Sequence, residues 1–176
     1  GPYWFVMGDP MGDREEFCDL VWSFKERAEA SGRKAVYYEV SERDLSLYVE
    51  QGLAPVKIGE NAKVPLADLS FEKGSEWHGQ RHTLNKLAKD GSVFRILSEE
   101  EKVSVLPRIK EISEEWLKSK QGHEKGFSLG FFSEEYICNF KIAVVERNGE
   151  IQAFANVWTS ADKNEVSPDM MRYMDN

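Results

Sequence analysis

Residues 141–158, K-I-A-V-V-E-R-N-G-E-I-Q-A-F-A-N-V-W, carry the pattern that decides the fold of this chain. Two largely apolar runs flank Asn148-Gly149, and an Asn-Gly pair between such runs is the strongest short-range signal of a two-residue type I′ turn. We therefore predict a β-hairpin that pairs Lys141–Arg147 with Glu150–Trp158. The elements on either side are assigned outward from this hairpin.

Strand and helix patterns alternate before the hairpin. Apolar runs predict strands at residues 3–7, 34–40, 93–97 and, after the hairpin, 165–173; helical spacing predicts helices at 13–32, 41–50, 74–90 and 98–120 and a short one from 133. Asp13 and a Ser98–Glu101 capping box mark two helix starts, and Pro107 is expected to kink or divide its helix. Residues 53–66 are expected to be extended. This order predicts an α/β fold with central mixed sheets flanked by helices.

The composition is that of an acidic, folded protein. A length of 176 residues allows one domain or two small ones, and the net charge of −8 disfavours a generic nucleic-acid binder. No apolar run is long enough to span a bilayer, and no signal peptide is visible. Cys18 and Cys138 lack a CxxC spacing and are expected to be reduced thiols of a cytosolic protein. The histidines form no zinc pattern, so we expect no metal.

The helix predicted at 74–90 carries a basic stripe within this acidic chain. Four lysines and arginines against one glutamate give residues 73–89 a net charge of +3. The candidate phosphate-binding residues on this stripe are Arg81, Asn85, Lys86 and Lys89. They lie on the same side of the helix as His78 and His82. Such a stripe suits the phosphates of an RNA or of anionic lipid headgroups. A solvated helix face is the alternative that the residues leave open.

A loop of charged residues, glycines and paired phenylalanines lies at 123–132, H-E-K-G-F-S-L-G-F-F. Glu124 is a candidate for holding a substrate's ammonium group, and Lys125 and Ser128 are candidate substrate-binding neighbours. A glycine-containing loop can approach a ligand closely while its phenylalanines anchor it. The alternative is a surface loop that does nothing more than bury its phenylalanines.

Polar residues also gather at the ends of the last predicted strands. Asn156 and Trp158 close the hairpin and are candidate substrate-binding residues, and Asp169 and Arg172 follow in the run 165–173. In a regular strand an offset of three puts Asp169 and Arg172 on opposite faces, with Arg172 beside Met170. Both can line one site only if Pro168 introduces a bulge or ends the strand. The alternative is an edge-strand ion pair with helix residues.

Five motifs together resemble the cytosolic C-terminal domain of phosphatidylglycerol lysyltransferases, the multiple peptide resistance factors. They are G-D-P-M-G at 8–12, R-H-T-L-N-K-L at 81–87, E-K-G-F-S-L-G-F-F at 124–132, A-F-A-N-V-W at 153–158 and D-M-M-R at 169–172. They lie in the family's order over nearly the whole chain. Pro168 stands where the family pattern predicts a β-branched residue, and the chain ends before the family's final segment.

The resemblance implies two tandem acetyltransferase-like units. We expect the first at residues 1–90, with the basic helix as connection, and the second, incomplete and truncated at its C-terminus, at 91–176. The loop with which acetyltransferases cradle the coenzyme A pyrophosphate is missing from the sequence. The acyl donor implied by the resemblance is instead a tRNA ester, so no cofactor is expected.

The implied activity is transfer of an amino acid from aminoacyl-tRNA to the glycerol hydroxyl of phosphatidylglycerol, which lowers the negative charge of the membrane; lysine is favoured, and alanine stays open. Asp169 and Arg172 are expected to border the reacting centre. An N-terminal transmembrane region of the full-length protein would hold this domain at the cytoplasmic face of the bacterial cell membrane. Two alternatives stay open: an aminoacyl-tRNA-dependent ligase acting on a peptidoglycan precursor, and a non-catalytic module that binds tRNA or anionic lipid.

Overall fold

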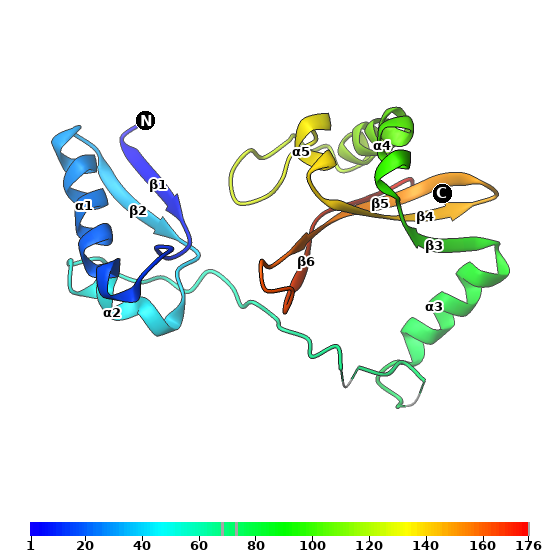
Figure 1. Ribbon diagram of the computed structural model, residues 1–176, viewed down its shortest axis with the longest axis horizontal. Helices are drawn as coiled ribbons and strands as arrows, with labels where there is room; N and C mark the ends of the chain where they lie inside the picture. Colours follow the sequence, from blue (N-terminus) through cyan, green and yellow to red (C-terminus); the bar gives the residue numbers. More distant parts are fainter. Residues whose placement is uncertain (68, 73, 176) are drawn as a thin grey trace. The chain divides into compact units, whose positions relative to one another are not determined.

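The computed structural model describes residues 1–67, 69–72 and 74–175 (Figure 1). The chain divides into two units, Gly1–Val64 and Pro65–Asn176. Each unit has its own sheet and its own helices, so each is described by itself.

The first unit is a parallel strand pair packed on a helix. β1 (Tyr3–Met7) pairs in parallel with β2 (Lys34–Tyr38), and the connection contains the 3-10 turn η1 (Arg14–Glu16) and α1 (Phe17–Ala30). Asp13 caps this helical segment, as predicted, by accepting a hydrogen bond from the Glu15 amide. The side chains of α1 that are buried are Phe17, Val21 and Ala28, whose spacing follows one helical face. The unit continues through η2 (Glu42–Asp44) and α2 (Leu45–Val49).

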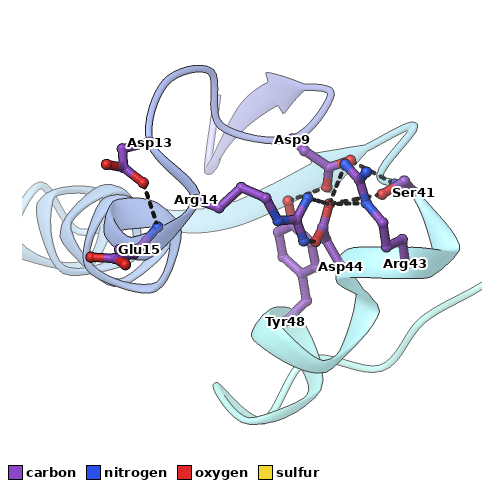
Figure 2. Close-up of polar contacts among 8 residues, drawn as sticks. All are labelled: Asp9, Asp13, Arg14, Glu15, Ser41, Arg43, Asp44 and Tyr48. Atoms are coloured by element: carbon purple, nitrogen blue, oxygen red, sulfur yellow. Dashed lines mark hydrogen bonds and ion pairs between the residues drawn. The ribbon is translucent and has the colours of Figure 1, made fainter.

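Two carboxylates tie the loop Gly8–Gly12 and the following η1 to the segment that leads into α2 (Figure 2). Asp9 accepts hydrogen bonds from the Ser41 amide at 2.9 Å and from the Tyr48 hydroxyl at 2.8 Å. Asp44 is buried and accepts bonds from Arg14 and from the Ser41 hydroxyl. The hydrogen bond from Arg14 holds the pKa of Asp44 below its ordinary value, while burial and then Asp9 raise the pKa of Tyr48. These contacts give the G-D-P-M-G motif a structural role in the first unit.

The second unit is an antiparallel sheet with order β3-β4-β5-β6. Its strands are β3 (Ser92–Ile96), β4 (Lys141–Arg147), β5 (Glu150–Thr159) and β6 (Val166–Tyr173). α3 (His78–Lys89) precedes β3, and α4 (Glu99–Ser119) and α5 (Glu134–Cys138) cover one face of the sheet (Figure 1). The core lies between that face and the two helices: Leu97, Leu106, Ile109, Ile112, Ile137, Ile142, Val144, Ile151, Phe154 and Met170.

The turn and capping signals in this unit behave as predicted. Asn148 and Gly149 both have positive φ, 54° and 81°, as a type I′ turn requires, and β4 pairs with β5 on either side of them. The Ser98–Glu101 capping box opens α4. Pro107 lies inside α4 without dividing it.

The fold class is confirmed: the protein is a mixed α/β structure with parallel and antiparallel sheets flanked by helices. The division at Val64 and Pro65 assigns α3 to the second unit, whereas the sequence placed a boundary after residue 90. Residues 53–67, all of them described, form no strand. Among the described helices, none combines the length and the apolar character that crossing a bilayer needs.

Candidate functional site

A bulge in β6 brings Asp169 to the helix-covered face of the sheet. Ala155 pairs with Met171 and Val157 with Pro168, so Asp169 and Met170 together oppose the single residue Asn156. The Asn156 side chain, fully buried, accepts a hydrogen bond from the Met170 amide at 2.8 Å. The bulge predicted as the condition for Asp169 and Arg172 to share one side of the strand is therefore present, immediately after Pro168.

The Asp169 carboxylate is held by donors from the loop, from α5 and from β5. The Tyr136 hydroxyl donates to Oδ2 at 2.7 Å, the Gly130 amide to Oδ1 at 2.8 Å, and the Asn156 side-chain amide to Oδ2 at 3.3 Å. A Cβ at Gly130 would lie 2.0 Å from Oδ2, so only glycine allows this approach. The carboxylate is thus fixed in position by segments 33 and 39 residues away along the chain.

These contacts keep Asp169 ionised. Partial burial by itself raises the pKa of the Asp169 carboxyl, but the bonds from Tyr136, Gly130 and Asn156, with a further contribution from Trp158, outweigh burial and hold this pKa below its ordinary value. The pKa of the Tyr136 hydroxyl, which donates to this carboxylate, shifts in the opposite direction: burial and the neighbouring charge of Asp169 raise it. At neutral pH the site therefore holds a carboxylate and a protonated phenol.

Aromatic rings surround this carboxylate. Tyr136 stacks on Phe131 with ring centroids 6.0 Å apart and packs edge-on against Phe140 at 4.9 Å. Phe140 stacks in turn on Trp158 at 5.0 Å. Phe131 and Trp158 remain 45% and 48% exposed, so the array reaches the surface. A fixed negative charge beside exposed π faces is an arrangement that attracts cations.

Arg172 forms a second polar cluster on the same side of β6. It is 5% exposed, and its guanidinium makes a bidentate pair with Glu124 at 2.7 and 2.8 Å. It also donates to the Ser113 hydroxyl of α4, and lies 5.4 Å from the centre of the Trp116 ring. The bond from Arg172 holds the pKa of Glu124 below its ordinary value, and the Phe132 amide adds to this. As predicted, Arg172 faces the core side with Met170.

The other residues predicted in the loop lie near Glu124 in sequence but differ in setting. Lys125 is exposed. Ser128 is half-buried and adopts a left-handed conformation with φ of 63°. Asn156 and Trp158 both reach the Asp169 cluster, Asn156 by a direct hydrogen bond. The structure therefore brings Asn156 and Trp158 together with Asp169, and Glu124 together with Arg172.

The predicted phosphate-binding residues lie on α3, apart from these clusters. Asn85, Lys86 and Lys89 are exposed. Arg81 instead donates to the carbonyls of Phe71 at 3.0 Å and of Gly74 at 2.8 Å. Its first role is therefore to hold the preceding loop against the helix.

Comparison with known proteins agrees with this architecture. The family described as "Phosphatidylglycerol lysyltransferase, C-terminal" matches residues 1–176. This chain belongs to that family. The phosphatidylglycerol lysyltransferase of Bacillus subtilis strain 168 is 37% identical over 169 residues, which are 96% of this chain and 19% of that protein. The enzyme of the same name from Staphylococcus xylosus is 32% identical over 97% of this chain and 20% of its own length.

Solved structures show the same fold. The crystal structure of the C-terminal domain of a protein assigned as a lysylphosphatidylglycerol synthetase, from Agrobacterium fabrum, matches with a TM-score of 0.90 at 35% identity, over 98% of this chain and 54% of that one. The structure of L-PGS from Bacillus licheniformis matches with a TM-score of 0.85 at 34% identity, over 98% and 53%. The chain thus spans about a fifth of its curated relatives and about half of these solved chains.

Four residues of the two clusters were missed in the sequence: Ser113, Trp116, Gly130 and Tyr136. Ser113 and Trp116 lie in a long amphipathic helix, where they read as ordinary face residues. Gly130 was visible as part of the quoted loop motif, but its contact with Asp169 depends on a strand 39 residues later. Tyr136 lies three residues after Ser133, where a short helix was predicted to begin, and its amide donates to the Ser133 hydroxyl. The helix start predicted at Ser133 was the local signal from which the direction of the Tyr136 side chain could have been inferred.

Proposed function

We propose that this chain is the part of a phosphatidylglycerol lysyltransferase that binds the aminoacyl group of aminoacyl-tRNA and passes it to the glycerol hydroxyl of phosphatidylglycerol. Membership of the family supports a lipid-aminoacylating transferase. The observation that carries the proposal is the ionised Asp169 carboxylate, fixed by Tyr136 and Gly130 and framed by exposed aromatic rings.

An aminoacyl ester presents an ammonium group, and a lysyl ester presents two. The Asp169 carboxylate can pair with one of them while Phe131 and Trp158 offer π faces to the same cation. Trp158 and Tyr136 then define the walls of the aminoacyl site, and the fully buried Asn156 holds the Asp169 carboxylate by its hydrogen bond. Because an additional cation suits a carboxylate in an aromatic setting, the site favours lysine over alanine as the transferred residue.

Arg172 and Glu124 act as positioning residues in this proposal. Their bidentate pair joins β6 to the loop that contains Gly130 and Ser128, and both oxygens of Glu124 already accept bonds from Arg172. The negative charge of Glu124 is therefore used within the protein, which leaves Asp169 as the carboxylate that meets the substrate. Lys125 and Ser128 lie on the loop held in this way and contact the donor from it.

The proposed reaction is an ester exchange without redox change. The glycerol oxygen of the lipid attacks the ester carbonyl carbon of the donor, and the carbon–oxygen bond to the terminal ribose breaks. The proton of the lipid hydroxyl ends on the released ribose oxygen. A base must remove that proton and a donor must stabilise the tetrahedral oxyanion, and neither step calls for a cofactor. Orientation of the aminoacyl group by Asp169 contributes by placing the carbonyl carbon within reach.

Both proposed substrates carry phosphate, tRNA along its whole backbone and phosphatidylglycerol in its headgroup, so both suit a cationic surface. Lys86 and Lys89, with Asn85 and Arg81, provide one on α3. In the full-length protein an N-terminal transmembrane region would keep this surface at the cytoplasmic face of the cell membrane.

The test is transfer of labelled amino acid by the full-length protein. Lysyl-tRNA with phosphatidylglycerol should yield labelled lipid faster than alanyl-tRNA does. Label appearing in a peptidoglycan precursor in place of lipid would support the related ligase, and binding of tRNA or lipid without transfer would support the non-catalytic module. Either result would overturn the proposal.

The Asp169 role is tested by Asp169→Asn, which keeps the shape and removes the charge. We expect kcat/KM for lysyl-tRNA to fall by about 100-fold or more, as loss of a charge-assisted contact in a partly buried site predicts. Glu114→Gln is the matched control, because it removes one carboxylate charge from the exposed side of α4. If the kcat/KM of Asp169→Asn equals that of the control variant, Asp169 does not take part in binding the donor.

A further inference from the structure

α3 is an amphipathic helix with an unusual setting. All twelve of its residues are described and none is buried. Its cationic and polar side chains form one stripe, whereas Leu84 and Leu87 lie on the opposite stripe and are 55% and 40% exposed. A helix of a folded domain normally buries its leucines, so this one presents an apolar stripe and a basic stripe to its surroundings together.

The segment before α3 extends the apolar stripe. The bonds from Arg81 to the carbonyls of Phe71 and Gly74 hold these two residues against the helix. Phe71 packs edge-on against Trp77 with ring centroids 4.9 Å apart and is itself 38% exposed. An open, largely apolar hollow of about 510 Å3 lies between Phe71 and Leu84, lined also by Gly79, Gln80 and Thr83. Aromatic and aliphatic side chains thus meet on one side of α3.

We propose that α3, together with Phe71 and Trp77, forms a membrane-surface element that lies in the headgroup region of an anionic bilayer. Leu84, Leu87 and Phe71 enter the boundary between headgroups and acyl chains, with Trp77 at the same depth. Lys86 and Lys89 contact lipid phosphates from the basic stripe. The inference rests on the proposed lipid acceptor and specifies that the protein binds the bilayer surface itself, beyond a single lipid molecule in the active site.

The exposed apolar side chains distinguish a membrane from RNA as the partner of this helix. An RNA backbone is bound by cations and hydrogen-bond donors, and its bases stack on aromatic rings, so solvent-exposed leucines add nothing to that contact. A bilayer interface uses both stripes of the helix. The chain as a whole carries a net charge of −8 and is repelled by an anionic surface, so a local basic and apolar element is the place where contact is favoured.

The test measures binding of the 176-residue chain to vesicles by co-sedimentation. We expect binding to vesicles containing phosphatidylglycerol, weak binding to pure phosphatidylcholine, and a decline with added salt. Lys86→Gln with Lys89→Gln should weaken binding by about 30-fold, since each lysine near an anionic surface contributes about 1 kcal/mol. Leu84→Ser with Leu87→Ser should weaken it by about tenfold or more through lost apolar burial.

Matched controls come from α4. Lys110→Gln with Lys118→Gln removes the same charge, and Val103→Ser removes an apolar side chain that is 71% exposed; both should bind vesicles like the unchanged chain. Brominated lipids should quench the fluorescence of the unchanged chain, and Trp77→Phe should remove most of that quenching. This second readout does not depend on the leucine variants folding.

The inference fails if the leucine variant binds anionic vesicles as well as its control does. It also fails if the lysine variant loses affinity for tRNA and keeps its affinity for vesicles, because α3 would then be an RNA surface. Neither readout involves aminoacyl transfer. A chain that binds vesicles through α3 but supports no transfer in the full-length protein would therefore overturn the proposed function and leave this inference standing.

Discussion

Gly130 offers a sharp test of how the Asp169 carboxylate is fixed, through the substitution Gly130→Ala. An added Cβ would lie 2.0 Å from Asp169 Oδ2, 2.9 Å from its Cγ and 2.8 Å from Tyr136 Cε1. The φ of Gly130 is not in the left-handed region, so the energetic cost of the substitution comes from these close contacts and not from backbone strain. To reach a separation of even 3.0 Å, the carboxylate has to retreat by about 1 Å.

Such a displacement weakens the hydrogen bonds that Asp169 accepts. The bonds from Tyr136 and Gly130 are 2.7 and 2.8 Å long, and a shift of that size stretches them beyond hydrogen-bond range. Overpacking of this kind costs about 1–3 kcal/mol, and bonds to a partly exposed charge add to it. We expect a loss of about 2 kcal/mol in the free energy of unfolding, which lowers Tm by about 4–8 °C for a protein of this size.

The assay is a double-mutant cycle in urea, followed by tryptophan fluorescence. Gly130→Ala is measured alone and in an Asp169→Ala background, where the oxygen in the way is gone, so a coupling of about 1 kcal/mol or more should appear. Gly126→Ala is the control in the same loop, because its Cβ would meet nothing within 4 Å. Equal costs of Gly130→Ala in both backgrounds would refute the proposed approach of the loop to Asp169.

Further predictions concern the ionisable groups. Glu124→Gln should lower the free energy of unfolding by about 1–2 kcal/mol in urea titrations, because it leaves the buried Arg172 with one charge partner fewer at a site that solvent partly screens. The folded-state pKa values of Glu124 and Asp169 are lowered, so the stability that these carboxylates contribute is present above the ordinary carboxyl pKa and is lost as pH falls through the lowered values. Urea midpoints measured from pH 7 down to 3 should therefore fall, and the fall should be smaller for the Glu124→Gln variant. Burial, with a contribution from Glu29, raises the pKa of Tyr37 to about 12, so its stabilisation is complete below pH 10 and is lost as pH rises toward 12, which absorbance of tyrosinate and a Tyr37→Phe variant should reveal.

Local signals predicted the local structure well. The Asn148-Gly149 turn, the Asp13 cap and the Ser98 capping box are each specified within four residues of sequence, and all are present. The alternation that puts Arg172 beside Met170 is likewise a property of a single strand. What depends on one element could therefore be predicted from that element alone.

Features that depend on two or more elements were harder to predict. The bulge at Asp169 required knowing that Asn156 stands opposite, which is a matter of strand register. The partner of Glu124 is 48 residues away, and nothing in the loop distinguishes a carboxylate that binds arginine from one that binds substrate. The sequence shows that α3 carries a basic stripe and leucines on its other side. It does not show that those leucines are exposed, because a helix that buries its leucines has the same pattern.

The distances along the chain between the partners of β6 have a consequence for the order of folding. Asp169 and Arg172 join segments 33 to 59 residues earlier, and closing loops of that length costs about 3 kcal/mol of chain entropy before any contact is made. Contacts of this kind form late, after the local hairpin of β4 and β5. Substitutions at Asp169 or Arg172 should consequently speed unfolding and leave the folding rate nearly unchanged. The polar site would then be the last part of the second unit to assemble and the first to come apart.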